Sequence, residues 1–106
     1  MGMKRFEIWY INLDPTQGKE IKKTRPCVIV SPNELNALHT RIIIPMTTKG
    51  FDLPTRLKIH FNKKESLLLC DQIRSVDKNR LISKIGELSK QECISLCEIL
   101  STMFEY

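Results

Sequence analysis

The sequence of 106 residues lacks any long hydrophobic run. Residues 1–10 hold no apolar stretch of the length that a secretion signal needs, and no segment approaches the roughly 20 apolar residues of a membrane-spanning helix. We therefore expect no membrane partner and a cytoplasmic protein whose thiols stay reduced.

Motifs for metals and nucleotides are also missing. The cysteines form no Cys-x-x-Cys pair, and the two histidines lie far from them in sequence, whereas structural zinc ligands usually occur as close pairs. We interpret the cysteines as small buried hydrophobes; they are Cys27, Cys70, Cys93 and Cys97. No Walker loop, Gly-x-Gly-x-x-Gly, Gly-x-Ser-x-Gly or magnesium-type carboxylate cluster appears. We expect no cofactor and no metal.

What is present is an ordinary globular composition with an excess of positive charge. Hydrophobic residues make up 42% and charged residues 27%, and 106 residues suffice for one domain, residues 1–106, with a single core. The net charge is +5, and the lysines and arginines are spread along the chain. This pattern favours a basic folded surface that suits a polyanion or an acidic partner.

Most of the chain has the pattern of short strands. Alternating or apolar runs predict strands over residues 5–13, 26–31, 41–47, 56–61, 65–73 and 82–89. Residues 14–24 form a charged loop, and loops of that length are usually functional or mobile. Brief helical turns are expected over 31–39 and 77–81. Pro26 predicts a strand's first residue or an edge, and Pro45 an edge or a bulge.

The C-terminus changes to a helical period. Ser89 followed by Glu92 is a capping box that starts a helix, and we predict this helix over residues 89–104. Ile94, Cys97, Leu100 or Ser101, and Phe104 recur at three- and four-residue steps and predict its apolar face. Many strands and one terminal helix indicate an α+β, mainly β fold: a curved sheet or half-barrel capped by the helix.

Polar side chains lie at the ends of several of these strands, where a core pattern does not require them. They are Thr24, Arg25, Thr47, Thr48, Asp71, Gln72 and Arg74. Singly, each is ordinary at a strand end. Together they supply a guanidinium that holds phosphate oxygens, a hydroxyl that donates to developing charge and a carboxylate that positions a proton. That set suits metal-free cleavage of a phosphodiester.

Two other features have a chemical and a structural interpretation. His39 and His60 could form an acid–base pair, but no supporting partner lies near them in sequence, so we favour surface or packing positions. Trp9 could stack on a base, but its place in an alternating strand favours packing on the sheet.

Four motifs in series resemble the MazF/PemK/Kid toxins of type II toxin–antitoxin modules. They are EIWYINLDPTQGKE, KKTRPCVIVSPN, IIIPMTT and LLLCDQIRSVDKNRL. The resemblance runs from about Arg5 to the terminal helix. It implies a small SH3-like barrel, a homodimer, and a metal-independent endoribonuclease that cuts single-stranded mRNA to 2′,3′-cyclic phosphate and 5′-hydroxyl ends. It also implies an acidic antitoxin that blocks the RNA groove.

The resemblance assigns roles to individual residues. Arg25 and Thr47 match the family's catalytic arginine and threonine, and Asp71 matches an acidic residue of PemK/Kid-type members. The RNA-binding residues are expected to be Glu20, Lys23, Thr24, Thr48, Gln72 and Arg74, with residues 15–23 over the groove. Leu69 replaces an arginine that serves as an acid in PemK/Kid-type members. We therefore hypothesise that Arg25 and Thr47 stabilise the transition state, with Asp71 orienting Arg25 or acting as a base.

Alternatives remain at this point. The chain could be a non-catalytic SH3-like module that binds RNA or peptide, or the same ribonuclease directed at tRNA or rRNA. The terminal helix carries apolar residues that either pack on their own barrel or form a dimer interface. They are Ile99, Leu100, Met103 and Phe104.

Overall fold

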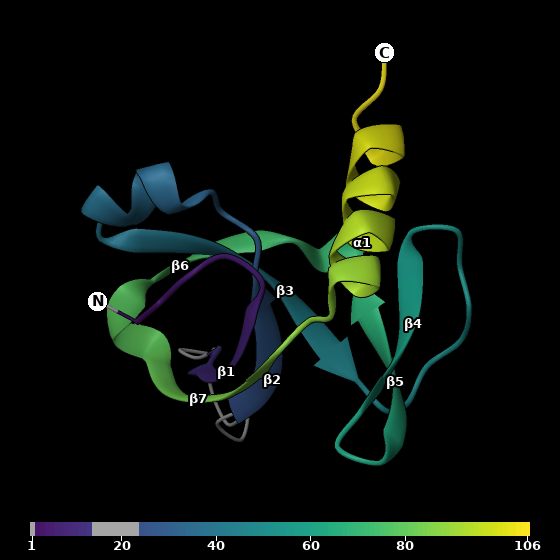
Figure 1. Cartoon of the computed structure of the whole chain (residues 1–106), viewed down its shortest axis with the longest axis horizontal. Coiled ribbons are helices and arrows are strands. Elements are labelled where there is room, and N and C mark those ends of the chain that lie inside the picture. Colours follow the sequence, from purple (N-terminus) through teal and green to yellow (C-terminus); the bar gives the residue numbers. More distant parts are fainter. Residues whose placement is uncertain (1, 14–23) are drawn as a thin grey trace, which may run out of the picture.

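The computed structural model describes residues 2–13 and 24–106 (Figure 1). The strands are β1 (Glu7–Asn12), β2 (Thr24–Ile29), β3 (Thr40–Thr47), β4 (Arg56–Phe61), β5 (Lys64–Leu69), β6 (Arg74–Asp77) and β7 (Leu81–Glu87). The helical elements are the 3₁₀ turns η1 (Asn33–Ala37), η2 (Cys70–Gln72) and η3 (Lys78–Arg80), and the helix α1 (Lys90–Met103). No helix in these described ranges is long and apolar enough to cross a membrane.

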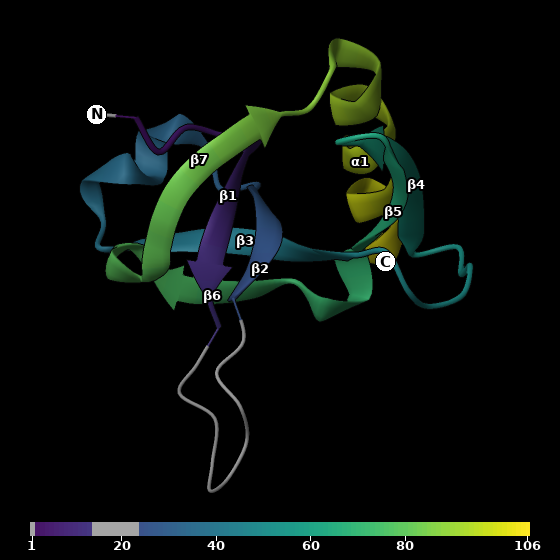
Figure 2. The same cartoon turned by 90° about the horizontal axis from the view of Figure 1, so that it is seen from below.

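The strands of the described residues form one antiparallel sheet in the order β4-β5-β3-β2-β1-β7, with β6 joined to β3. Strand β3 serves both ends of this sheet: its first half pairs with β6, and its last residues, Met46 and Thr47, pair with β5. Figure 1 shows β3 crossing from the curled part of the sheet to the β4–β5 hairpin. Figure 2 shows α1 beside that hairpin and β7 on the other side. The predicted mainly β half-barrel with a terminal helix is confirmed.

The middle strands are buried on both faces. One set, the helix-side core, packs against α1 and the β4–β5 hairpin and includes Ile8, Val28, Ile44, Leu68 and Leu96. The other, the curl-side core, fills the curl of β1, β2, β3, β6 and β7 and comprises Ile11, Cys27, Ile29, Ile43, Val76 and Leu81. Successive strand residues point to opposite faces, which explains why β2 and β3 have continuous apolar runs rather than an alternation.

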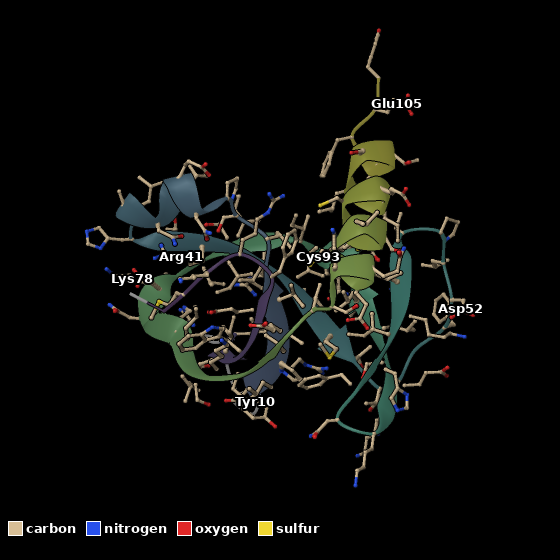
Figure 3. All side chains as sticks on the ribbon, viewed as in Figure 1. Tyr10, Arg41, Asp52, Lys78, Cys93 and Glu105 are labelled. Carbon is tan, nitrogen blue, oxygen red and sulfur yellow. The ribbon has the colours of Figure 1, made fainter. Side chains whose placement is uncertain are left out.

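The capping box of α1 is confirmed. The Ser89 hydroxyl accepts from the Glu92 amide at 3.2 Å, and the Glu92 carboxylate accepts from the Ser89 amide at 2.8 Å. The predicted apolar face is only partly right: Leu100 packs against the helix-side core, but Leu96 is the fully buried residue, and Ile94 and Phe104 are exposed. Cys93, Ile99, Leu100 and Met103 pack partly against the helix-side core, and Figure 3 shows Cys93 on the side of α1 that faces the curled sheet.

Several predicted strand limits differ from the observed ones, among them the start of β2 and the end of β5. Strand β2 begins at Thr24, so Pro26 is its third residue; it pairs with Tyr10 of β1, and the pairing with β3 starts one residue later, at Cys27. Pro26 therefore lies where β2 still has a free edge on one side, which satisfies the proline constraint. The strand predicted over 65–73 ends at Leu69, because Cys70–Gln72 turns into η2. Strand β6 was not predicted.

Pro45 lies inside a central strand, not on an edge of the sheet. It falls between Ile43, the last β3 residue that pairs with β6, and Met46, the first that pairs with β5. The missing amide hydrogen therefore removes no ladder hydrogen bond to either strand. The proline marks the point where β3 changes partners.

Candidate active site

Arg25 and Thr47 come together because β2 and β3 are antiparallel neighbours. Cys27 pairs with Pro45. Arg25 lies two residues before Cys27 and Thr47 two residues after Pro45, at the same end of the antiparallel pair. Both therefore belong to the face of these strands that carries Cys27 and Pro45. The two candidate catalytic residues, 22 positions apart in the sequence, meet at one end of the strand pair.

Two hollows meet at these strand ends. The first, of about 650 Å³, is lined by Pro26 and Met46, which lie on the helix-side face of the strands. The second, of about 410 Å³, is lined by Pro45, which lies on the opposite face. Arg25, Thr47 and Lys49 line both hollows. These three residues form the shared centre of an open polar surface, and the name shared centre is kept for them below.

The hydroxyl of Thr47 has a defined orientation. The Lys49 amide donates a hydrogen bond to Thr47 Oγ1 at 3.1 Å. A hydroxyl has one hydrogen to donate besides its acceptor sites. With an acceptor site engaged by Lys49, the hydroxyl hydrogen of Thr47 remains available for a ligand oxygen in either hollow.

Arg25 differs from most arginines of the molecule in its contacts. Its backbone is fixed by pairing with Ile11 of β1, and its side chain is half-buried. Within residues 2–13 and 24–106, its guanidinium has no hydrogen-bond or ion-pair partner. The side chain lines both hollows, and an oxyanion is the natural ligand for the N–H groups of a guanidinium.

Asp71 lies apart from Arg25 and is held by other groups. Its carboxylate accepts from Arg56 Nε at 3.1 Å and Nη2 at 3.2 Å, and from the Thr55 hydroxyl at 3.2 Å. The hydrogen bonds from Arg56 hold the pKa of the Asp71 carboxyl below its usual value and raise the pKa of Arg56. The contact of this carboxylate is therefore with Arg56, not with Arg25, and Asp71 does not line either hollow.

The other predicted RNA-binding residues divide into three groups. Thr24 and Thr48 line the first hollow, and Gln72 lines the second. Arg74 is exposed at the start of β6, outside the linings of both hollows. Glu20 and Lys23 lie outside the described residues.

Lys49, Tyr10 and Arg56 are among the lining residues that the sequence analysis missed. Lys49 directly follows the Thr47-Thr48 pair, and this neighbouring position could have indicated that it belongs to the site. Tyr10, exposed on β1, lines the first hollow, and Figure 3 shows it on the opposite side of the molecule from Glu105. Arg56 lines the second hollow; it begins an alternating strand, so its pattern is that of an ordinary surface cation.

Cys27 and Cys70 are buried, and Cys93 and Cys97 are half-buried. Burial raises the pKa of Cys27 to about 12 and that of Cys70 to about 11, so both stay as thiols. All four cysteines are free. In the part of the chain that the structure describes, no three His, Cys, Asp or Glu side chains gather as a candidate metal site.

The histidines and the tryptophan have structural positions. His39 and His60 are both exposed, on the turn before β3 and on β4. Trp9 packs against the curl-side core, and its indole donates to Glu7 at 2.9 Å. Burial opposes the charge on Glu7, but the hydrogen bonds from Trp9 and its neighbours hold the pKa of this carboxyl below its usual value. The packing interpretation of Trp9 is confirmed.

The fold and the shared centre can now be compared with known proteins. A family model described as "PemK-like, MazF-like toxin of type II toxin-antitoxin system" matches residues 4–104. Among solved structures, Mycobacterium tuberculosis toxin MazF-mt6 superposes with a TM-score of 0.78 at 23% identity, over 93% of this chain and 96% of that chain. A MazE–MazF structure from Deinococcus radiodurans has a TM-score of 0.80 at 20% identity, over 94% and 93%. These matches define the class: a small curled-sheet toxin.

Curated relatives identify the family more closely. Endoribonuclease MazF9 of Mycobacterium tuberculosis is 33% identical over 92% of both chains. Endoribonuclease MazF of Staphylococcus epidermidis is 32% identical, over 89% of this chain and 84% of the relative. The chain belongs to the PemK/MazF family of type II toxins. The predicted family and the predicted endoribonuclease class are thereby confirmed at the level of the family.

Proposed function

We propose that this toxin cleaves single-stranded RNA, chiefly mRNA, without a metal and leaves 2′,3′-cyclic phosphate and 5′-hydroxyl ends. The observation that carries the proposal is the shared centre, where the guanidinium of Arg25 and the hydroxyl of Thr47 face two adjoining hollows. An RNA strand that occupies both hollows has one linkage at their junction. That linkage is the one cut.

The chemistry follows from the groups at the junction. The 2′-hydroxyl of the substrate loses its proton as its oxygen attacks the phosphorus, and the bond from phosphorus to the 5′-oxygen breaks as that oxygen takes up a proton. The products are the 2′,3′-cyclic phosphate and the 5′-hydroxyl. Arg25 binds the phosphate oxygens and, with the Thr47 hydroxyl, stabilises the charge that grows on them. Arg25 does not move the proton, because an arginine is not deprotonated in proteins.

The same chemistry fixes what the substrate must be. DNA lacks the 2′-hydroxyl, so DNA of the same sequence binds without being cut. The RNA must also leave its helical stack so that the 2′-oxygen, the phosphorus and the 5′-oxygen fall in line. This requirement favours single-stranded RNA over a duplex.

The partner is an acidic antitoxin that covers the hollows. The net charge of +5 supports this partner, as does the solved relative described as an endoribonuclease in complex with its cognate antitoxin. The toxin acts in the cytoplasm, where its RNA is. It forms a homodimer, and the exposed Ile94 of α1 and Phe104 directly after the helix support an apolar contact between copies.

Incubation of the purified protein with mixed single-stranded RNA in EDTA tests the activity. Discrete cuts that end in cyclic phosphate are expected, and they should disappear in Arg25→Ala but persist in Lys58→Gln, a charge-loss control on β4. Among the described residues, Lys58 forms an ion pair only with the exposed Asp52, at 3.6 Å. Figure 3 shows Asp52 in the loop before β4.

Intact RNA in every sample would support the binding-module alternative instead. A cleavage map restricted to tRNA or rRNA in a total RNA mixture would correct the proposed target but retain the chemistry.

A further inference from the structure

The second hollow has a fixed cation on its wall. Arg56 donates two hydrogen bonds to Asp71 and a third, from Nη1, to the Phe51 carbonyl at 3.2 Å. Its guanidinium also lies over the Phe51 ring, 5.1 Å from the centroid. The Asp71 end of this arrangement is fixed in turn, because the Cys70 amide donates to the Thr55 carbonyl at 3.2 Å. Arg56 is thus held on three sides.

Arg56 retains hydrogen-bonding capacity beyond these contacts. A guanidinium carries five N–H groups, and three are used here, so one on Nη1 and one on Nη2 remain. Arg56 shares the hollow with Arg25 and Lys49. Its charge is balanced by Asp71, but those of Arg25 and Lys49 have no ion-pair partner among the described residues. The hollow therefore attracts an anion, and a second phosphate fits its chemistry.

Phe51 adds an aromatic surface to the same unit. Its side chain is 67% exposed although it is large and apolar. The contact with the Arg56 guanidinium restrains the ring. Proteins that bind single-stranded RNA stack its bases on aromatic side chains, and an exposed, restrained ring beside a phosphate-binding cation is the arrangement this binding uses.

We propose that Phe51, Arg56 and Asp71 form a nucleotide-binding subsite for the residue next to the cleaved linkage. Arg56 binds the phosphate that flanks the scissile one, and Phe51 stacks on the neighbouring base. Asp71 is a positioning residue that holds Arg56 in place. The inference rests on the proposed ribonuclease activity and extends it to a second phosphate.

The assignment of Asp71 has a direct consequence. If its carboxylate acts through Arg56, Asp71→Asn should raise KM more than it lowers kcat. The pH profile of kcat should keep the wild-type shape, because no catalytic proton is lost. A changed profile together with a large fall in kcat would overturn the positioning role and indicate a base.

The phosphate contact is tested by pairing protein variants with substrate variants. A short cleavable RNA is made with a neutral methylphosphonate at one linkage at a time on either side of the cut. In the wild type, one flanking position should lower kcat/KM about tenfold, the usual scale of a charge-assisted hydrogen bond. In Arg56→Gln that position should have little further effect, while Lys58→Gln should behave as the wild type does.

The base contact is tested with abasic substitutions in the same RNA. Loss of the neighbouring base should cost the wild type several-fold in kcat/KM and cost Phe51→Ala little, while Phe51→Trp should retain the wild-type response. If the loss of kcat/KM caused by the protein variant simply multiplies the loss caused by the substrate change at every flanking position, the two groups do not interact. That result, for either variant, would overturn the subsite. Arg56→Lys keeps the charge, and Arg56→Gln/Asp71→Asn leaves no unpaired carboxylate. Both guard against misfolding as the cause of a loss.

The two proposals fail in different ways. If the wild type cuts none of these RNAs, the proposed function is wrong. If the wild type cuts them and the variants show no coupling, the ribonuclease stands and the subsite is wrong.

Discussion

Two arginines line the second hollow and differ in how they are held. Arg56 makes three hydrogen bonds and a ring contact. The guanidinium of Arg25 has no such partner among the described residues, although its backbone is fixed by β-pairing. Both carry the same charge, so their contacts, not their charge, separate their roles.

The difference indicates which arginine acts on the reacting phosphate. A cation that already binds a carboxylate offers the same interaction to the substrate before and during the reaction, which strengthens binding but not the chemical step. A cation with uncommitted donors can make its strongest contacts with the charge that forms in the transition state. We therefore assign stabilisation of the transition state to Arg25 and binding of the substrate before the reaction to Arg56.

The largest effect is expected for Arg25→Ala. Loss of a main oxyanion donor lowers kcat by about 10²–10³-fold, while thermal stability should stay close to that of the wild type because the guanidinium has no hydrogen-bond or ion-pair partner among the described residues. Rate measurements and thermal unfolding on the same samples check both parts. A destabilised Arg25→Ala protein with only a modest loss of rate would show that Arg25, like Arg56, acts mainly through contacts within the protein.

Thr47→Val removes the hydroxyl and keeps the shape. We expect a loss of kcat of about 10²-fold, near the lower limit for one oxyanion donor, since Arg25 remains. Thr47→Ser is the matched control and should retain most activity. Equal losses in Val and Ser variants would show that side-chain packing matters here, not the hydroxyl.

Lys49→Met separates the charge of the shared centre from its hydrogen bonds. The Lys49 amide that orients Thr47 is unaffected, so only the ammonium is lost. RNA affinity should fall about tenfold, on the scale of one charge-assisted contact, and the slope of log K against log salt should become shallower by about 0.7. An unchanged salt slope would place Lys49 away from the phosphates.

The smallest effect concerns acid stability. The pKa of Asp71 is lowered in the folded state from the usual 3.8, so its ion pair stabilises the fold above that pH and the contribution is lost as the pH falls below it. The urea midpoint of Asp71→Asn should lie slightly below that of the wild type near neutral pH, because the pair is partly exposed. The gap should close in acid; a gap that widens would contradict the direction of the shift.

Local patterns predicted most of the fold. The capping box gave the start of α1 because it needs only residues within one turn. The two-residue period gave β4 with its observed limits. The bifurcation of β3 could not be predicted, because the partners of Pro45 depend on where β5 and β6 arrive along the chain. The buried face of α1 was partly misassigned because apolar residues surround much of that helix.

The candidate site divides in the same way. Arg25 and Thr47 could be predicted from motifs that occur next to apolar strands. The Arg56–Asp71 pair could not, because it depends on the register that places Arg56 opposite Leu69, and an arginine that starts an alternating strand has no distinguishing signal. The same limit applies to Phe51, whose partner is also Arg56.

The most direct test of the account measures binding and chemistry separately for the two arginines. A single cleavable RNA in EDTA is used for single-turnover rates, and its uncleavable 2′-deoxy form is used for Kd. The account predicts that Arg25→Ala loses mainly the rate of cleavage and that Arg56→Gln loses mainly affinity. The reverse pattern, or equal losses of both quantities in both variants, would contradict it.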